Sequence, residues 1–350
     1  MAERGGIIGH FEAQARACER LGSPFTAGLC RALAGIIDET TETGRRVLHW
    51  DGDPDADALS LRLCGGLHAL VLGRRDPVLG AAFPPRAANP FILRALLPAT
   101  LRNHDRALSR VLDSPPQTNE VARSAMLLPG LLLLARQWSL PLALHEIGAS
   151  AGLNLGLDRF FYRYGESRWG DPQSPVSLAP ELRGAPVPLE GTLRIASRQG
   201  SDRAPVSLFV PEQVMRLRSF VWPDQTARLE RLDAAVGLAQ EARVRVRRAD
   251  ATEAVRRMLA ERKEGEGSVL MHSVVWQYLP ENTRQAIVDL MVDGGERASA
   301  AMPLAWLRME PARAPAGIEP HAALTLTTWP GAQTRHLADC DFHGRWIAWK

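Results

Sequence analysis

The sequence predicts an α/β protein in which a helical region, residues 1–138, precedes a mostly parallel, doubly wound sheet in residues 139–350. Two observations predict this arrangement. Before residue 141, apolar residues recur at three- and four-residue spacing and no convincing strand pattern occurs. From residue 141 onward, short β-prone runs alternate with helical runs, which is the pattern of repeated strand–helix units.

Composition favours a globular chain of two domains. The protein has 350 residues, of which 45% are hydrophobic and 23% charged, so it can bury a full core. Its net charge is +3, and arginine supplies all of the 42 basic residues except Lys263 and Lys350. This bias is typical of a GC-rich bacterial genome. Because the arginines are mixed with acids and form no basic block, we do not expect nucleic-acid binding.

Cysteine spacing and hydropathy point to a cytoplasmic protein. Cys18, Cys30, Cys64 and Cys340 lie far apart without a zinc-ligand spacing, so we expect reduced thiols and no metal. The amino terminus lacks the apolar run of a signal peptide. Pro129 and Arg136 interrupt the most apolar stretch, so no membrane association is expected.

The helical region is divided by prolines and glycines. Ser23 and Pro24 are typical of a helix start, as an N-cap followed by the first helical residue. The predicted helices cover residues 7–21, 23–37, 56–73, 89–112 and 118–138.

Seven strands are predicted after this region. They cover residues 142–148, 191–200, 243–250, 267–279, 298–310, 322–330 and 344–350. Predicted helices over 151–165, 224–242, 251–263 and 280–295 connect the first five strands. The last two strands have no helix between them, which predicts a hairpin at the sheet edge.

The stretch "HEIGASAGLN", residues 145–154, follows the first strand and allows two interpretations. Gly148 to Gly152 spell G-x-S-x-G, the pattern of a hydrolase nucleophile elbow with Ser150 as the nucleophile. Such an elbow normally follows several strands and an oxyanion loop, and neither precedes it here. The other interpretation is a cofactor turn, in which Gly148 and Gly152 let the backbone approach a nucleoside and Glu146 accepts a hydrogen bond from it.

Residues after the later strands favour the cofactor interpretation. Asp202 follows the second strand, where a carboxylate commonly binds ribose hydroxyls, although this strand begins unusually far from the glycine turn. Asp250 ends the third strand and Ala251 follows it, and we expect contact with adenine there, although Asp250 as an N-cap is equally expected. Three further residues are assigned to the cofactor or its turn: Ser150, Asn154 and Ser273.

The order of these elements resembles the S-adenosylmethionine-dependent methyltransferase fold. The segments "EIGASAGLNLGLDRFFYRYG", "RQGSDRAPV", "FVWPDQTARLERLDAA" and "HSVVWQYLP" more closely resemble a bacterial family of uncharacterised proteins, known only as a domain of unknown function. The resemblance covers nearly the whole chain. It implies a helical region before a Rossmann-like, seven-stranded methyltransferase-type sheet and S-adenosylmethionine as cofactor, but no substrate.

Methyl transfer to an unknown small molecule is therefore the expected activity. Methyl transfer needs mainly positioning, so few obligatory residues are expected; Glu120, His272 and Tyr278 are the candidate bases. Polar residues of a lid, Gln117, Asn119 and Arg123, and the aromatic Trp276 are assigned to the substrate. A structural role is the simpler interpretation for His272, Asn154 and the terminal His343. A non-catalytic cofactor-binding protein and a serine hydrolase remain alternatives, and the oligomeric state is open.

Overall fold

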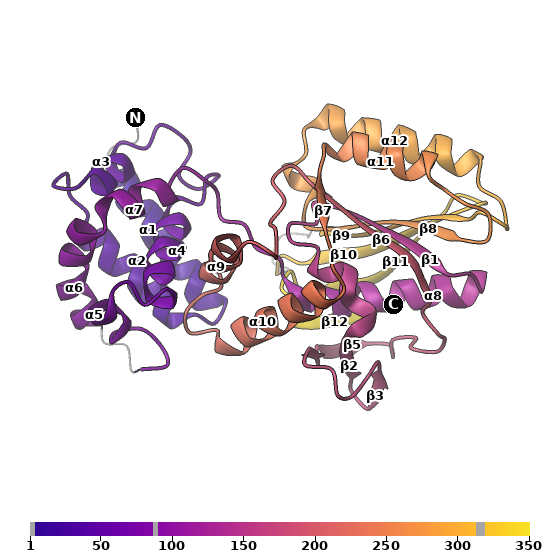
Figure 1. The fold of residues 1–350 in the computed structure, drawn as a ribbon, viewed down its shortest axis with the longest axis horizontal. Coiled ribbons are helices and arrows are strands. Elements are labelled where there is room, and N and C mark those ends of the chain that lie inside the picture. Colours follow the sequence, from indigo (N-terminus) through magenta and orange to yellow (C-terminus); the bar gives the residue numbers. More distant parts are fainter. Residues whose placement is uncertain (1–3, 87–89, 313–318) are drawn as a thin grey trace. The chain divides into compact units, whose positions relative to one another are not determined.

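A computed structural model describes residues 4–86, 90–312 and 319–350, and it divides the chain into two compact units (Figure 1). Unit 1 comprises Met1–Thr118 and Val210–Glu230, and unit 2 comprises Asn119–Phe209 and Arg231–Lys350. The boundary thus differs from the expected one at residue 138, because residues 119–138 belong with the sheet. Within the described ranges, no helix combines the length and apolar character that a membrane crossing requires.

Unit 1 is a bundle of helices around an apolar core. Ser23 caps the second helix as expected, and Ile7, Phe11, Leu29 and Leu63 are fully buried. The predicted helix over 89–112 begins at a residue outside the described ranges and is divided at His104 into two helices. The helices are α1 (Arg4–Arg20), α2 (Pro24–Ile36), α3 (Glu42–Leu48), α4 (Leu59–Leu72), α5 (Pro77–Gly80), α6 (Pro90–Asn103), α7 (Asp105–Val111) and α9 (Pro211–Ser219).

Unit 2 is built on a sheet of nine strands, where seven were predicted. Its strands are β1 (Leu142–Ile147), β5 (Glu181–Gly184), β6 (Ile195–Asp202), β7 (Val246–Arg248), β8 (Gly267–Ser273), β9 (Leu304–Pro311), β10 (Ala322–Trp329), β11 (Gln333–Cys340) and β12 (Trp346–Trp349). The two additional strands are β5 and β11. The prediction missed β11 because its alternation is weak, with four exposed residues before the first buried one.

The sheet order is β5-β12-β11-β10-β9-β8-β1-β6-β7. The five neighbouring strands β9, β8, β1, β6 and β7 are all parallel. From β1 the chain continues through β6 to β7 on one side, and then returns to form β8 and β9 on the other side of β1. The order therefore reverses between β1 and β8. The expected hairpin of the last two strands is wrong, because β11 lies between β10 and β12 and pairs antiparallel with both.

Helices cover both faces of the sheet (Figure 1). On one face, α11 (Ala251–Ala260) and α12 (Glu281–Glu296) pack Val255 and Ile287 against Ile147, Leu270 and other apolar residues of the strands. On the other face lies α8 (Ser124–Trp138), preceded by the short helix η1 (Val121–Arg123). The remaining helices are α10 (Thr226–Glu241), which spans the boundary in sequence, and η3 (Trp276–Tyr278).

The segment after the glycine turn is not the predicted helix over 151–165. It forms a short 3₁₀ helix, η2 (Leu153–Arg159), and then the three-stranded sheet of β2 (Phe161–Tyr164), β3 (Ser167–Trp169) and β4 (Ser177–Leu178). The prediction failed because apolar side chains at helical spacing are here divided between η2 and the alternating pattern of β2. Tyr162 and Tyr164 point inward from that strand and donate their hydroxyls to backbone carbonyls.

Candidate functional site

The residues that follow β1 lie where the strand order of the sheet reverses. Residues 148–152 form the turn between β1 and η2, and β6 and β8 flank β1 on either side. In open α/β sheets, ligands bind beyond the carboxyl ends of the strands at such a reversal. The candidate site therefore centres on this turn.

Glu146 is a buried carboxyl just before the turn. The side chain is 3% exposed, and its Oε2 atom has no hydrogen-bond partner among the described residues. The pKa of Glu146 is raised to about 8, chiefly by burial and also by the charge of Asp202, while a hydrogen bond from Asn154 and the charge of Arg123 lower it. A buried polar atom without a partner is costly, so this oxygen is suited to a ligand that donates a hydrogen bond.

Two residues near the turn have backbone conformations that are rare for their side chains. Ser150 has φ +52° and Val274, which follows β8, has φ +55°. Left-handed backbone is especially unfavourable for a β-branched residue such as valine. The Ser150 hydroxyl is buried and, like Glu146 Oε2, has no partner in the described ranges. Strain of this kind is concentrated at binding sites in proteins.

The turn uses most of its amide hydrogens internally. Ala149 N–H donates to the Ser201 carbonyl (3.1 Å) and Gly152 N–H to the Ala149 carbonyl (2.7 Å). Ser150 N–H donates to Asp202 Oδ2 (2.8 Å), and Leu153 N–H donates to Asn119 Oδ1 (2.9 Å). A phosphate cradle presents free N–H groups to its ligand. This turn is therefore better suited to a nucleoside without phosphates than to a dinucleotide.

Packing alone requires glycine at positions 148 and 152. Gly148 has φ +65°, and a Cβ atom there would lie 2.3 Å from Val275 Cγ2. Gly152 has φ +76°, and its Cβ would lie 2.9 Å from methyl groups of both Val244 and Val246. The glycines bring the turn into contact with the segments after β8 and before β7. Their identity is thus not by itself evidence for a ligand.

Gly148→Ala is expected to destabilise the protein by about 2 to 4 kcal/mol, since it adds both a strained φ and an overpacked contact. Gly237→Ala is the matched control, because Gly237 lies in α10 and a methyl group added there would have no atom within 4 Å. We expect that control to be neutral or stabilising by up to about 1 kcal/mol. Urea unfolding measures both effects. Equal stabilities of the two variants would contradict the close approach of position 148 to Val275.

Asp202 and Asp250 have structural partners. Asp202 ends β6 and accepts from Ser150 N–H and, through Oδ1, from Ala204 N–H (2.8 Å). It thereby holds the glycine turn against β6. Asp250 is the N-cap of α11 and accepts from Thr252 N–H (2.8 Å), as the structural alternative expected. Ala251 packs in the apolar cluster under α11.

The segment 119–124 lies beside the turn and connects it to α8. Asn119 accepts from Leu153 N–H, and Ser124 donates to Asn154 Oδ1 (2.8 Å). Asn154 is 1% exposed and hydrogen-bonds to Glu146, so it links this segment to the buried carboxyl. Arg123 donates to the carbonyls of Ser273 (3.2 Å) and Phe342 (2.9 Å), which ties the ends of β8 and β11 to the site.

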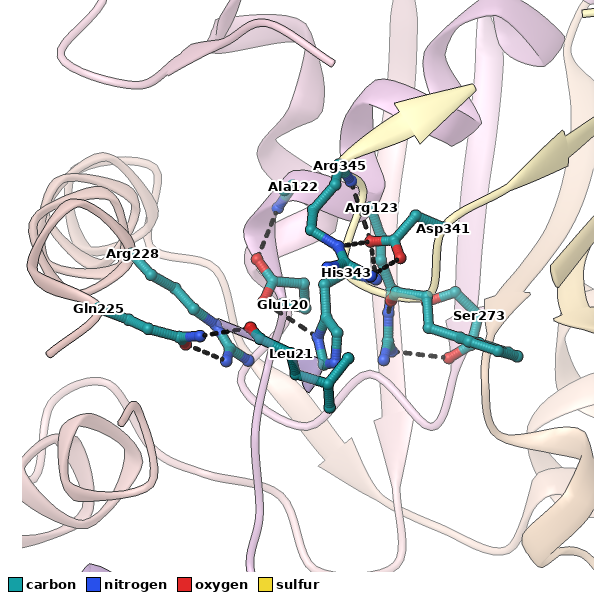
Figure 2. Close-up of polar contacts among 11 residues, drawn as sticks. Leu21, Glu120, Ala122, Arg123, Gln225, Arg228, Ser273, Asp341, His343 and Arg345 are labelled. Atoms are coloured by element: carbon teal, nitrogen blue, oxygen red, sulfur yellow. Dashed lines mark hydrogen bonds and ion pairs between the residues drawn. The ribbon is translucent and has the colours of Figure 1, made fainter. Parts of the chain in front are cut away.

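Glu120 of this segment forms an ion pair with His343, which lies far away in the sequence (Figure 2). Glu120 is 4% exposed, accepts from Ala122 N–H (3.1 Å), and has its Oε2 3.8 Å from His343 Nδ1. His343 lies in the turn between β11 and β12, which Asp341 holds through bonds to Arg345 and to the His343 backbone. Gly344 lets this turn approach η1 closely, since a Cβ there would lie 2.4 Å from the Ala122 carbonyl.

His272 is committed to the core. It is fully buried at 0% exposure, and its Nε2 accepts from Trp306 Nε1–H (2.9 Å). This assigns the proton to Nδ1, which donates to Glu310 Oε1 (2.6 Å). With both nitrogens engaged, the imidazole has the structural role that was its simpler interpretation and offers no free atom to a substrate.

The remaining candidates are dispersed. Trp276 stacks on His272 with ring centroids 5.3 Å apart and packs against the apolar cluster of α11 and α12. Tyr278 is 72% exposed, so its hydroxyl lies at the surface. Gln117 belongs to unit 1, whereas the site described above lies in unit 2. No cluster of three or more potential metal ligands occurs in the described ranges.

The hydrolase interpretation of Ser150 gains no support from this geometry. A nucleophilic serine needs a base within hydrogen-bond reach, and that base needs a third group to orient it. The Ser150 hydroxyl has no such partner within the part of the chain that the structure describes. His343 has a carboxylate nearby, with Glu120 Oε2 at 3.8 Å from its Nδ1, but it is not hydrogen-bonded to the serine.

Comparison with known proteins identifies a family. The model of the family described as "Uncharacterized protein conserved in bacteria (DUF2332)" matches residues 9–349, and the chain therefore belongs to this family. No curated protein and no solved structure matches the chain. The family has no assigned activity, so the chemistry of the site is the basis for a functional proposal.

Proposed function

We propose that this DUF2332 protein binds S-adenosylmethionine at the carboxyl end of β1 and transfers its methyl group to a small molecule. The observation that carries the proposal is Glu146, a buried carboxyl with an unpartnered oxygen at the reversal of strand order. Ser150, with a second unpartnered oxygen, lies in the same turn. The internal use of the turn's N–H groups favours a cofactor without phosphates.

The residues present fit this cofactor. Glu146 would accept from its amine or a hydroxyl, and Ser150 would bond to a polar atom of the nucleoside. Asp202 would act chiefly by holding Ser150 in its left-handed conformation. When bound, S-adenosylmethionine supplies an activated methyl group, which is transferred by an in-line displacement that depends mainly on positioning.

The pair of Glu120 and His343 is the proposed base. Glu120 Oε2 lies 3.8 Å from His343 Nδ1, near enough to stabilise a protonated imidazole, and His343, whose side chain is 34% exposed, is accessible enough to take a proton from an acceptor. This assignment retains Glu120, one of the candidates predicted from the sequence. It replaces His272, because both nitrogens of that imidazole are hydrogen-bonded in the core. An acceptor with an ionisable O–H or N–H group is the class that such a base serves.

Calorimetry with S-adenosylmethionine tests the proposal. Glu146 has a pKa of about 8, so near pH 7 it is mostly protonated, and a cationic ligand beside it favours the carboxylate. We expect saturable binding with release of up to one proton. The observed enthalpy then depends on the ionisation enthalpy of the buffer, and Glu146→Gln removes this dependence. Glu190→Gln, at an exposed carboxyl, is the control.

Absence of binding at millimolar cofactor would exclude the proposal. Binding without conversion to S-adenosylhomocysteine, when the protein is supplied with a bacterial small-molecule extract, would favour the non-catalytic alternative. In the catalytic case His343→Ala lowers turnover and leaves cofactor affinity unchanged, because His343 is assigned to the acceptor.

A further inference from the structure

A cavity of unit 2 opens on the face of the sheet opposite to the Glu146 side chain, and Glu146 itself is one of its lining residues. Side chains alternate along a strand, so His145 and Ile147 face α11 while Glu146 faces η2. The cavity has a volume of about 390 Å³ and is lined by residues of β1, β6, β7 and α11, together with Arg245 and Leu270. Its size falls in the range of small-molecule sites, roughly 300–1,000 Å³.

The register of three parallel strands builds the floor of this cavity. His145 is paired with Gln199, Ile147 with Ser201, and Ser201 in turn with Arg247. Paired residues in neighbouring strands point to the same face, so these polar side chains lie in adjacent rows. Ala254 and Arg257 of α11 form the wall, and the small Ser201 and Ala254 leave the space between floor and wall.

His145 is a nearly buried polar group in the floor of the cavity. It is 8% exposed, lines the cavity, and makes no hydrogen bond to any described residue. Burial lowers the pKa of His145 to about 4, so the imidazole is neutral and has both a donor and an acceptor available. The neighbouring Gln199, which also lines the cavity, donates its amide N–H to Glu261 (3.1 Å).

Positive charge surrounds the cavity. Arg257 is paired with Glu253 on α11. Arg245 and Arg247 also line the cavity and form no ion pair with a described residue, although Arg245 lies 5.2 Å from the centre of the Phe209 ring. Arginine binds phosphate oxygens through two parallel N–H donors, which makes it the preferred side chain for phosphate groups.

We propose that this cavity is a separate binding site for a small phosphorylated molecule. Arg245 and Arg247 bind the phosphate, and His145 with Ser201 hydrogen-bonds to the uncharged polar part. The side chains assigned to this ligand lie on the opposite face of the sheet from the Glu146 carboxyl that is assigned to the cofactor, so the two sites use different side chains. The proposal therefore stands whether or not S-adenosylmethionine binds.

Titration with pyrophosphate, followed by calorimetry at physiological ionic strength, tests the site. We expect saturable binding of one pyrophosphate, weakened about tenfold or more by Arg247→Glu, because a charge-assisted hydrogen bond is replaced by repulsion. His145→Phe should weaken pyrophosphate binding less than Arg247→Glu does, because His145 is assigned to the uncharged part of the ligand. Circular dichroism of each variant reports whether it is folded.

Arg248→Glu is the matched control. Arg248 is the next residue of β7, is also exposed, and donates to the Arg203 carbonyl instead of lining the cavity. Its replacement should leave pyrophosphate affinity unchanged. Absence of saturable pyrophosphate binding to the wild type would overturn the proposal. Equal losses of affinity in Arg247→Glu and Arg248→Glu would also overturn it, because they would show only a general attraction to the positive surface. S-adenosylmethionine affinity, measured in the same variants, separates this result from the fate of the cofactor site.

Discussion

Replacing Glu146 with glutamine is expected to stabilise the protein increasingly as the pH rises from 4.5 to 8. The carboxyl has an ordinary pKa of 4.5 and a pKa of about 8 in the folded protein. Between these values the folded protein holds a proton that the unfolded chain has released. Below pH 4.5 the carboxyl is protonated in both states, and its stabilising contribution is complete. As the pH rises from 4.5 through 8, the unfolded chain is favoured increasingly because only it ionises readily, and this contribution is lost.

The expected magnitude is large because the carboxyl is fully enclosed. At about 1.4 kcal/mol for each pKa unit, the free energy of unfolding of Glu146→Gln should gain on the order of 4 to 5 kcal/mol over the wild type across this interval. Urea unfolding at several pH values, followed by tryptophan fluorescence, measures the difference. The exposed Glu190→Gln should change stability little at any pH. A constant difference for Glu146→Gln would show that the carboxyl titrates in its ordinary range.

The same substitution is expected to weaken S-adenosylmethionine binding. A variant that is more stable and binds less well has lost a group kept for function at a cost in stability. A purely structural carboxyl would produce the opposite result, a loss of stability with unchanged binding. Glu146→Gln therefore distinguishes a ligand contact from a packing role in one variant.

Glu310→Ala is expected to destabilise the protein by about 3 to 5 kcal/mol, the loss typical of breaking a buried charged or hydrogen-bonded group. Glu310 accepts from His272 Nδ1–H, from Val275 N–H (3.1 Å) and from Trp276 N–H (3.1 Å). Its side chain is only 14% exposed. Removing it leaves three buried or half-buried donors without their acceptor.

Cofactor affinity should fall together with stability in this variant, because Val275 packs against Gly148. Glu310→Gln keeps one acceptor oxygen and should lose less of both. Chemical unfolding and calorimetry of the two variants provide the comparison. A loss below about 1 kcal/mol in Glu310→Ala would mean that water replaces the carboxylate at no cost.

Local patterns were sufficient for the parts of the fold that depend on neighbouring residues. The strand at 142–147, the N-cap at Asp250 and the capped helix after Ser23 follow from hydrophobic period and capping chemistry. The helix expected at 151–165 did not form, because its apolar side chains are shared between a 3₁₀ turn and a strand that joins a separate sheet. Periodicity over one turn does not distinguish these outcomes.

The candidate site was predicted where one strand and its turn define it, and missed where distant segments meet. Glu146 and Ser150 are recognisable from "HEIGASAGLN" alone. Glu310 and His343 are not, because their partners are 35 to 38 and 223 residues away in sequence, as the contacts to His272, Val275 and Glu120 show. No local signal marks a residue whose role depends on a contact across the sheet.

By itself the sequence determined that a helical region precedes an α/β sheet and that a glycine-containing turn follows its first strand, since both depend on local period and small side chains. Only the tertiary structure decided what the polar residues do. It buried His272 between Glu310 and Trp306, brought His343 to Glu120, and left Glu146 with an unpartnered oxygen. The physical reason is that the state of a polar group depends on the partners and solvent around it, and packing of distant segments sets both.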